Sequence, residues 1–538
     1  MQNFKDVTRQ ANGEREVLFS LSNLKQYFPV EGQRDANVKA VDGITLKIYK
    51  GETFGLVGES GCGKSTLGRV ILRIYDPTDG RTLYYGRSIY DLSPRYVDKT
   101  YKDFYKLRDQ VKDLEQRYEK RKAEYDALSE EEQFKQHGEY TALEKQYKDS
   151  FLNLTELVGG LYAVEKPDAE LALLRKAFAT GYKRAQTRLA LEHWFGSYSE
   201  EIEAREPLAD MKSRDKKKLD RYYALTDELH DYVRQLEEAK DKYKGDPEFD
   251  KYEKFYDTGI DLARLTYDEM RPLRRDMQLV FQDPYSSLNP RMTAGQIIGE
   301  GMDAHGIYAD DSAAREQHIK DTMELCGLQA YMLYRYPHQF SGGQRQRIGI
   351  ARSLALNPEF IVADEAVSAL DVSIQSQIIN LLSDLKEEKD LTYFFISHDL
   401  SVVKYISDRI GVMYLGTLVE MAPTEELFES PRHPYTEALL SAIPTTDPDS
   451  RDKEVTILEG DIPSPVNPPS GCKFHTRCPY MTEICEHIDP EWEEVSEGHF
   501  VACHHKLPPH SGQLFTTRLP EDFTSEFIET DEEEESEV

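Results

Sequence analysis

A glycine-rich stretch near the N-terminus combines residue types that can hold the phosphates of a nucleotide. The sequence GESGCGKST supplies Gly58, Ser60, Gly61, Cys62, Gly63, Lys64, Ser65 and Thr66. Glycines let backbone N–H groups turn towards phosphate oxygens, Lys64 places a cation on the β- and γ-phosphates, and the Ser65 hydroxyl can bind Mg²⁺. A loop that merely turns a corner is the alternative reading. The Gly-x4-Gly-Lys-Ser spacing favours nucleoside triphosphate binding.

Two further polar groups lie far downstream. The apolar segment 360–365, FIVADE, ends in two carboxylates: Asp364 can hold the Mg²⁺ shell, and Glu365 can polarise an attacking water. An apolar strand ending in acids also occurs in ordinary α/β proteins, so this pair alone decides nothing. The second polar group begins a predicted helix, and the positive N-terminal end of that helix can receive a γ-phosphate. It consists of Ser341, Gly342, Gly343 and Gln344.

The elements around the first site follow one order along the chain. Residues 53–57, TFGLV, predict a short buried strand, and the apolar-periodic run LGRVILRI behind the glycine loop predicts a helix. The helix adds the positive end of its dipole to the phosphate site. Strand, loop and helix together predict a P-loop that binds a nucleoside triphosphate, without indicating which kind of protein carries it.

The block SGGQ followed by RQRIGIARSLALNPEFIVADE resembles the signature-to-Walker-B region of ATP-binding-cassette (ABC) ATPases. The resemblance covers residues 17–92 and 268–440. It implies a RecA-like core, an antiparallel β subdomain and a helical signature subdomain. In that family the signature serves the nucleotide held by the P-loop of the facing subunit, so two subunits sandwich each ATP.

The same resemblance implies roles for further residues. Gln282 resembles the Q-loop glutamine that senses the γ-phosphate, binds Mg²⁺ and contacts the transporter. Asp371 closes SALD, which resembles the D-loop, and His398 resembles the switch histidine that contacts the γ-phosphate. Phe28 occupies the position of the aromatic that stacks on adenine, with Tyr27 as the competing candidate. Each of these could instead be an ordinary loop, strand-end or core residue.

The stretches RPLRRDMQLVFQDPYSSLNPRMT and ADEAVSALDVSIQSQIINLL resemble dipeptide and oligopeptide importer ATPases, specifically the second of their two paired subunits. This implies a heterodimer with a sister ATPase, two transmembrane permease subunits, an extracytoplasmic solute-binding protein and a place at the cytoplasmic face of the membrane. Ala366 departs from the proline usual in that subfamily. A proline there stiffens the turn without touching ATP, so we expect little effect on the chemistry.

Four of the six cysteines crowd into the C-terminal quarter: Cys472, Cys478, Cys485 and Cys503. Clustered cysteines in a reducing compartment are more often metal ligands than crosslinks, and this spacing is not that of a paired CxxC zinc ribbon. CKFHTRCPYMTEIC resembles the C-terminal region of peptide-importer ATPases, in which such cysteines hold an iron–sulfur cluster. That resemblance favours [4Fe–4S], while nearby histidines keep a Zn²⁺ site open, and unliganded buried thiols are the third alternative.

Residues 93–267 interrupt the cassette, and the resemblance does not extend over them. Apolar residues recur there at steps of three and four in two stretches, 104–128 and 222–243. Two such heptad helices predict an antiparallel coiled-coil hairpin whose stripe is the seam between them. A docking surface for another protein is the alternative role. The predicted division is 1–92 and 268–440 for the ATPase, 93–267 for the insertion, 441–515 for the cysteine-bearing region and 516–538 for a disordered acidic tail.

Composition limits what the chain can do. The sequence contains no run of about 18 apolar residues, so no bilayer-spanning helix is predicted. A net charge of −31 argues against a surface that binds nucleic acid. A coiled-coil ABC ATPase of DNA maintenance is therefore disfavoured. Its coil would also follow the Q-loop, whereas this insertion precedes Gln282. A ribosome-associated ABC protein would carry two cassettes, but only one P-loop is found. Nickel or an oligosaccharide remains an alternative cargo to peptides.

Overall fold

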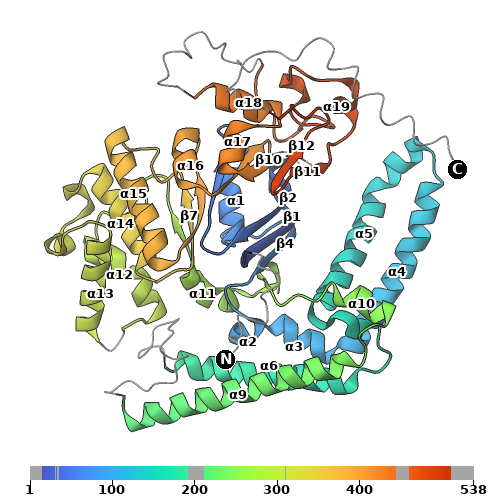
Figure 1. The fold of residues 1–538 in the computed structure, drawn as a ribbon, viewed down its shortest axis with the longest axis horizontal. Helices are drawn as coiled ribbons and strands as arrows, with labels where there is room; N and C mark the ends of the chain where they lie inside the picture. Colours follow the sequence, from blue (N-terminus) through green and yellow to red (C-terminus); the bar gives the residue numbers. More distant parts are fainter. Residues whose placement is uncertain are drawn as a thin grey trace.

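The computed structural model describes residues 15–30, 32, 36–191, 211–308, 311–443 and 460–509. The predicted acidic tail lies outside the described residues. Figure 1 shows a central body of sheets and helices from which the helices of the insertion extend. Within the described ranges, no helix combines the length and apolar character that crossing a bilayer needs.

The main sheet runs through the centre of the body and has the order β11-β12-β10-β9-β3-β8-β7-β6. The five strands from β9 to β6 are parallel, and the others pair antiparallel. Parallel strands covered on both faces read as continuous apolar runs, as FIVAD and TYFFI do. The strands are β3 (Thr53–Val57), β6 (Met277–Val280), β7 (Phe360–Asp364), β8 (Thr392–Ile396), β9 (Arg409–Tyr414), β10 (Thr417–Pro423), β11 (Trp492–Ser496) and β12 (His499–Ala502).

A second, antiparallel sheet has the order β2-β1-β4-β5. Its strands are β1 (Val17–Pro29), β2 (Asn37–Tyr49), β4 (Asp79–Tyr84) and β5 (Ile260–Asp261). Alternating burial along the second half of β2 shows that one face of this sheet is packed and the other is open. The chain leaves this sheet after β4 and returns to it at β5, so the insertion starts and ends at one edge.

Helices cover both faces of the main sheet and form a separate lobe of α12 to α15, at the left of Figure 1. They are α1 (Lys64–Ile71), α11 (Tyr267–Asp276), α12 (Ala294–His305), α13 (Ser312–Leu325), α14 (Gly342–Leu354), α15 (Val372–Lys389), α16 (Leu400–Ile406), α17 (Thr424–Glu429), α18 (Pro434–Ser441) and α19 (Glu483–His487). The parallel core, antiparallel sheet and helical lobe confirm the predicted ABC-type α/β fold.

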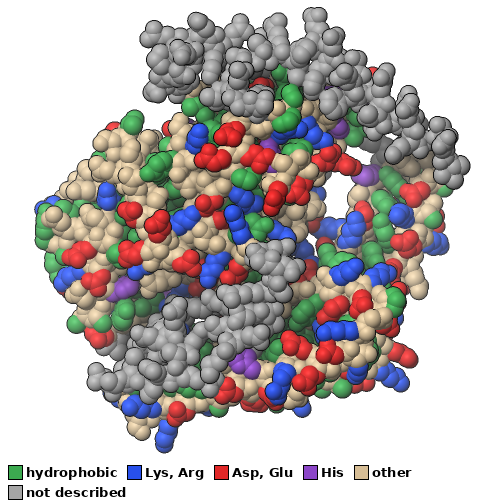
Figure 2. Space-filling view, viewed as in Figure 1, with side chains coloured by type: hydrophobic (Ala, Val, Ile, Leu, Met, Phe, Trp, Pro, Cys, Tyr) green, Lys and Arg blue, Asp and Glu red, His purple; other side chains and the backbone are tan. Residues whose placement is uncertain are grey.

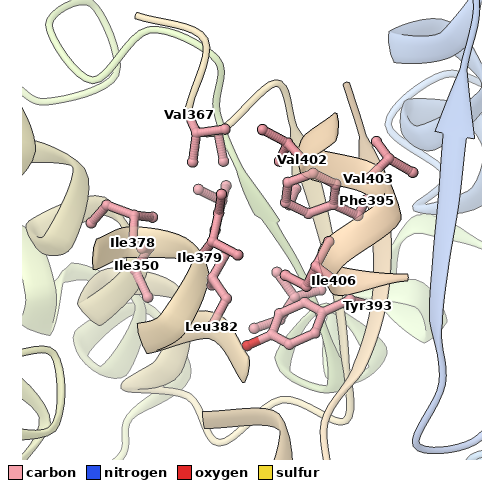
Figure 3. Close-up of a cluster of buried hydrophobic side chains, with 14 of the residues drawn as sticks. Ile350, Val367, Ile378, Ile379, Leu382, Tyr393, Phe395, Val402, Val403 and Ile406 are labelled. Carbon is pink, nitrogen blue, oxygen red and sulfur yellow. The ribbon is translucent and has the colours of Figure 1, made fainter. Parts of the chain in front are cut away.

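An apolar cluster joins α14, α15 and α16 to strand β8 (Figure 3). Ile378 of α15 lies beside Ile350 of α14, and Val403 of α16 lies beside Phe395 of β8. All four side chains are buried to 1% exposure or less. Burial of this apolar surface fixes β8 beside β7, and the residues that follow both strands enter the predicted site.

The insertion consists of two antiparallel helix pairs, not the single predicted hairpin. Its described helices are α3 (Arg95–Lys102), α4 (Phe104–Asp126), α5 (Glu130–Val158), α6 (Asp168–Leu189), α9 (Ser213–Asp241) and α10 (Pro247–Glu253), and α2 (Ile89–Leu92) directly precedes them. Helix α4 packs on α5, and α6 packs on α9 (Figure 1). The predicted seam between the stretches 104–128 and 222–243 is therefore wrong. Each apolar stripe instead packs against a helix closer in sequence. For α4 and α5 the short connection 127–129 favours antiparallel neighbours.

Acidic and basic side chains are interspersed over the face shown in Figure 2. The same view shows an opening between the α4/α5 pair and the body of the molecule. The tips of α4 and α5 therefore extend away from the sheets, while their bases pack on them. Arg81 of β4 anchors the base, because it forms ion pairs with Glu156 of α5 and Asp261 of β5.

Candidate nucleotide site

The glycine loop joins β3 to α1 at the carboxyl edge of the parallel strands, where α/β folds bind ligands. Gly63 has a φ of 107°, and a Cβ there would lie 1.9 Å from the carbonyl oxygen of Ala40. Only glycine fits so close an approach. The Lys64 ammonium is 4% exposed and donates to the carbonyl oxygens of Gly58 and Glu59 at 2.7 and 3.0 Å. Burial raises the pKa of Cys62, against the effect of Lys64, so its thiol stays protonated.

Ser65 and Asp364 meet across the site, although 299 residues separate them. The Ser65 hydroxyl donates to the Asp364 carboxylate at 2.5 Å. Arg69 of α1 donates to the other carboxylate oxygen at 3.3 Å, and Asp364 is 1% exposed. A hydroxyl and a buried carboxylate side by side are a donor set that suits Mg²⁺. Sequence reasoning missed Arg69, because no motif marks it.

Glu365 lies between Gln282 and His398, as the sequence predicts for a site that handles the γ-phosphate. The Gln282 amide donates to Glu365 Oε2 at 2.7 Å, and His398 Nδ1 is 3.4 Å from the same oxygen. Glu365 has a φ of 48°, in the left-handed region, and its backbone N–H donates to the Ile396 carbonyl at 3.0 Å. Such strain at a non-glycine residue is typical of functional sites. The loop thus turns the Glu365 carboxylate towards the ends of β6 and β8.

The signature segment begins helix α14. The Ser341 hydroxyl accepts from the Gln344 backbone N–H, and the Gln344 side chain accepts from the Ser341 N–H, so both close a capping box. A Cβ on Gly343 would lie 2.5 Å from Ile374, so glycine lets α15 approach α14 closely. Asp371 caps α15 through the Ile374 N–H at 3.0 Å. Helices α14 and α1 lie well apart in Figure 1. The signature therefore does not reach the P-loop of its own chain.

The two candidate adenine-stacking residues differ in their surroundings. The Tyr27 hydroxyl donates to the Asp42 carboxylate at 2.5 Å, and burial together with Asp42 raises the pKa of Tyr27. The neighbouring Phe28 points to the other face of β1, where its ring meets Tyr75 edge-on at 5.4 Å. Phe28 is half-buried, with a ring face free of this contact. The geometry favours Phe28 over Tyr27 as a stacking surface.

The C-terminal cysteines lie near one another in the segment that follows α18. Cys472, Cys485 and Cys503 are buried, Cys478 is half-buried, and all are free thiols. Burial, with a smaller contribution from the neighbouring Cys472 and Cys485, raises the pKa of Cys478 to about 12. Across the described ranges, no three His, Cys, Asp or Glu side chains are arranged to hold a metal ion. The four thiols are thus grouped without forming a closed metal site.

Known proteins match this chain over its cassette and its C-terminal region. Residues 41–186 and 253–368 match the family "ABC transporter", and 419–485 match "Oligopeptide/dipeptide transporter, C-terminal region". The putative oligopeptide transport ATP-binding protein YkfD of Bacillus subtilis is 37% identical over 90% of this chain and 95% of its own length. The chain belongs to the ABC transporter family. As a member of this family it is an ATPase.

Two more relatives agree with this assignment. The oligopeptide transport ATP-binding protein AppF of Bacillus subtilis is 34% identical over 91% of this ABC ATPase and 98% of its own chain. A putative peptide import ATP-binding protein of Brucella ovis is 56% identical over 46% of this chain and 76% of its own. Among solved structures, the dimeric ATP-binding cassette MJ0796 covers 76% of this chain and 99% of its own, at 17% identity and a TM-score of 0.40. So distant a structural likeness supports no further statement.

Proposed function

We propose that this ABC ATPase drives a membrane importer of dipeptides and oligopeptides. The observation that carries the proposal is a complete catalytic constellation joined in one chain to a C-terminal region of the oligopeptide/dipeptide transporter family. Its relatives carry the names of peptide and oligopeptide transport ATP-binding proteins. ATP binding closes two ATPase subunits and hydrolysis reopens them, and this movement switches the permeases between inward- and outward-facing states.

The residues of the site have separate roles in ATP hydrolysis. The glycine loop and Lys64 hold the phosphates, and Ser65, Asp364 and Gln282 would hold Mg²⁺, which neutralises charge on the β- and γ-phosphates when bound. Glu365 accepts a proton from the attacking water, with Gln282 and His398 orienting its carboxylate. Ser341 to Gln344 receive the γ-phosphate of the facing subunit's nucleotide, and Asp371 lies at the same interface. Phe28 stacks on adenine.

The partner subunits follow from this mechanism. Because α14 cannot reach its own P-loop, a second ATPase must supply the other half of each site. We propose that a sister ATPase supplies it, so that the two ATPases form a heterodimer. This heterodimer lies at the cytoplasmic face of the membrane, against two transmembrane permeases. A solute-binding protein outside delivers the peptide. Residues 93–267 form an appendage of the ATPase domains 1–92 and 268–440.

A surface rich in aromatic side chains is the proposed docking site for a permease. We call this the Q-loop aromatic surface; its exposed members are Phe281, Tyr285, Tyr331, Tyr334 and Tyr336. Tyr331 is 62% exposed and Tyr334 69% exposed, and the ring of Tyr285 lies 3.8 Å from the Arg345 guanidinium of α14. Tyrosine beside arginine is typical of residues that anchor protein interfaces. A permease bound here touches the loop that carries Gln282.

Co-purification and uptake test this proposal. The full assembly in liposomes should take up a labelled peptide only with ATP, and Lys64→Ala should abolish uptake. Tyr331→Ser with Tyr334→Ser should release the permeases while leaving nucleotide binding intact. Tyr182→Ser, on an exposed tyrosine of α6 outside this surface, is the matched control. Uptake that is unchanged in the Lys64→Ala assembly contradicts the proposed motor role.

The four clustered cysteines are proposed to hold a [4Fe–4S] cluster, with Zn²⁺ as the alternative. Neighbouring cysteines of the group help to raise the pKa of Cys472, Cys478 and Cys503, and thiols are the ligands that iron–sulfur clusters take. Anaerobically purified protein should contain iron and acid-labile sulfide. Cys472→Ser and Cys478→Ser should remove both, whereas Cys326→Ser should not. Zinc without iron in the unsubstituted protein contradicts the cluster.

A further inference from the structure

The segment between Cys472 and Cys478, CKFHTRC, packs directly against the nucleotide site; we call it the cysteine segment. Its Phe474 is 1% exposed and meets the rings of Tyr414 and Tyr435, each at 5.3 Å. Tyr414 ends strand β9, which is paired with the P-loop strand β3. This packing brings the two basic residues of the segment, Lys473 and Arg477, to the two ends of the site.

Arg477 forms an ion pair with a residue of the P-loop. Its guanidinium forms a bidentate ion pair with the Glu59 carboxylate, with distances of 2.8 and 3.1 Å. The Arg477 side chain is 5% exposed, and its pair with Glu59 joins residues 418 positions apart. Glu59 is held at two more atoms: its N–H donates to the Tyr435 hydroxyl at 2.9 Å, and its carbonyl accepts from Lys64. The position of Glu59 thus determines the position of the carbonyl to which Lys64 is bonded.

Lys473 forms an ion pair at the other end of the site, near the position proposed for adenine. Its ammonium lies 2.7 Å from the Asp42 carboxylate of β2. Asp42 also accepts from the Tyr27 hydroxyl, and hydrogen bonds from Lys473 and Tyr27 outweigh burial, so the pKa of Asp42 is lowered. Tyr27 directly precedes Phe28 on β1. Lys473 therefore secures the strand that presents the adenine-stacking ring.

We propose that the cysteine segment positions both halves of the ATP site, Arg477 through Glu59 for the phosphates and Lys473 through Asp42 for the base. A bidentate pair between the buried Arg477 side chain and the half-buried Glu59 fixes geometry as well as charge, because its two parallel hydrogen bonds admit one orientation. Whether the flanking cysteines Cys472 and Cys478 hold a metal group or are free thiols thereby affects nucleotide affinity. The inference concerns the ATPase site alone and does not depend on the proposed permeases or peptide cargo.

Nucleotide binding by single and double variants of the full chain tests the inference. Arg477→Gln should weaken ATP binding about tenfold, the order expected when a charge-assisted hydrogen bond is lost. KM for ATP should rise by a similar factor while kcat changes little, because the catalytic carboxylate is untouched. GTP should be weakened equally, since the P-loop contacts only phosphates. Lys473→Gln should weaken ATP binding but leave the binding of inorganic triphosphate, which has no base to stack on Phe28, unchanged.

A double-mutant cycle separates positioning from a general loss of structure. Glu59→Gln and Arg477→Gln together should weaken ATP binding no more than either change alone, because both break one contact. Lys506→Gln is the control: its ion pair with Glu493 lies in the same C-terminal region but does not reach the site. Additive effects, or an unchanged ATP affinity in folded Arg477→Gln protein, overturn the inference. Should Arg477→Gln not fold, folded Arg477→Lys, which keeps the charge but not both hydrogen bonds, must bind ATP more weakly than the unsubstituted protein, and a wild-type affinity overturns the inference.

Discussion

Replacing Glu365 by glutamine isolates the proposed base from the rest of the site. In the structure one carboxylate oxygen accepts from Gln282 at 2.7 Å and lies 3.4 Å from His398 Nδ1. Glutamine keeps an oxygen that can accept the Gln282 hydrogen bond, and its shape is the same, so nucleotide binding should persist. The proton acceptor is lost. General-base catalysis contributes about a hundredfold to ten-thousandfold, which corresponds to about 2.7–5.4 kcal/mol of activation free energy.

Phosphate release in multiple-turnover assays should therefore fall by at least about a hundredfold, while ATP affinity measured by filter binding stays near the original value. ATP-bound dimers should accumulate, because closure no longer ends in hydrolysis. Glu388→Gln, on the exposed face of α15, is the matched control and should leave both quantities unchanged. Hydrolysis within about threefold of the unsubstituted rate would refute the assignment of Glu365 and require another base.

Two predictions address stability. Phe395→Ala, in the core of Figure 3, should lower the free energy of unfolding by about 3–5 kcal/mol, because it leaves a cavity at a fully buried site. Val372→Ala is the control and should change the free energy of unfolding little, because Val372 is 79% exposed. Equal urea midpoints for the two variants would contradict the packing around Phe395. Burial, with help from Asp261 and Asp257 and against Arg81, raises the pKa of Glu156 from 4.5 to about 7. The folded state then holds this proton more tightly than the unfolded state, so the contribution of Glu156 to stability is greatest below pH 4.5 and falls as pH rises to about 7, by up to about 3 kcal/mol. Glu156→Gln should flatten this decline in urea unfolding at pH 5 and pH 8, and an unchanged slope would show that Glu156 is not its source.

The nucleotide site could be predicted because local sequence carries it. A glycine loop, a strand ending in Asp364 and Glu365, and a capped helix at Ser341 each have a fixed spacing that follows from phosphate chemistry. Their assembly follows from the parallel sheet, since the carboxyl ends of β3, β7 and β8 lie at one edge.

The insertion shows where sequence periodicity fails. The stripe through Val111, Leu114 and Tyr118 is buried as predicted, yet it packs against α5 and not against the second heptad stretch. An apolar stripe specifies which face of a helix is buried but does not identify its partner. The same limit applies to strands β11 and β12, which extend the main sheet through β10, and to Arg477, whose partner Glu59 no spacing could indicate.

The central claim is that each ATP is held between the P-loop of one subunit and the signature helix of the other. An ATP analogue with a photoreactive group on the γ-phosphate tests it directly, in assemblies of this chain carrying Glu365→Gln with its co-purified sister ATPase. Mass spectrometry should find label on residues 341–344 of this chain only when the sister subunit is present. Labelling of these residues in the isolated chain, or none in the assembly, would contradict the account.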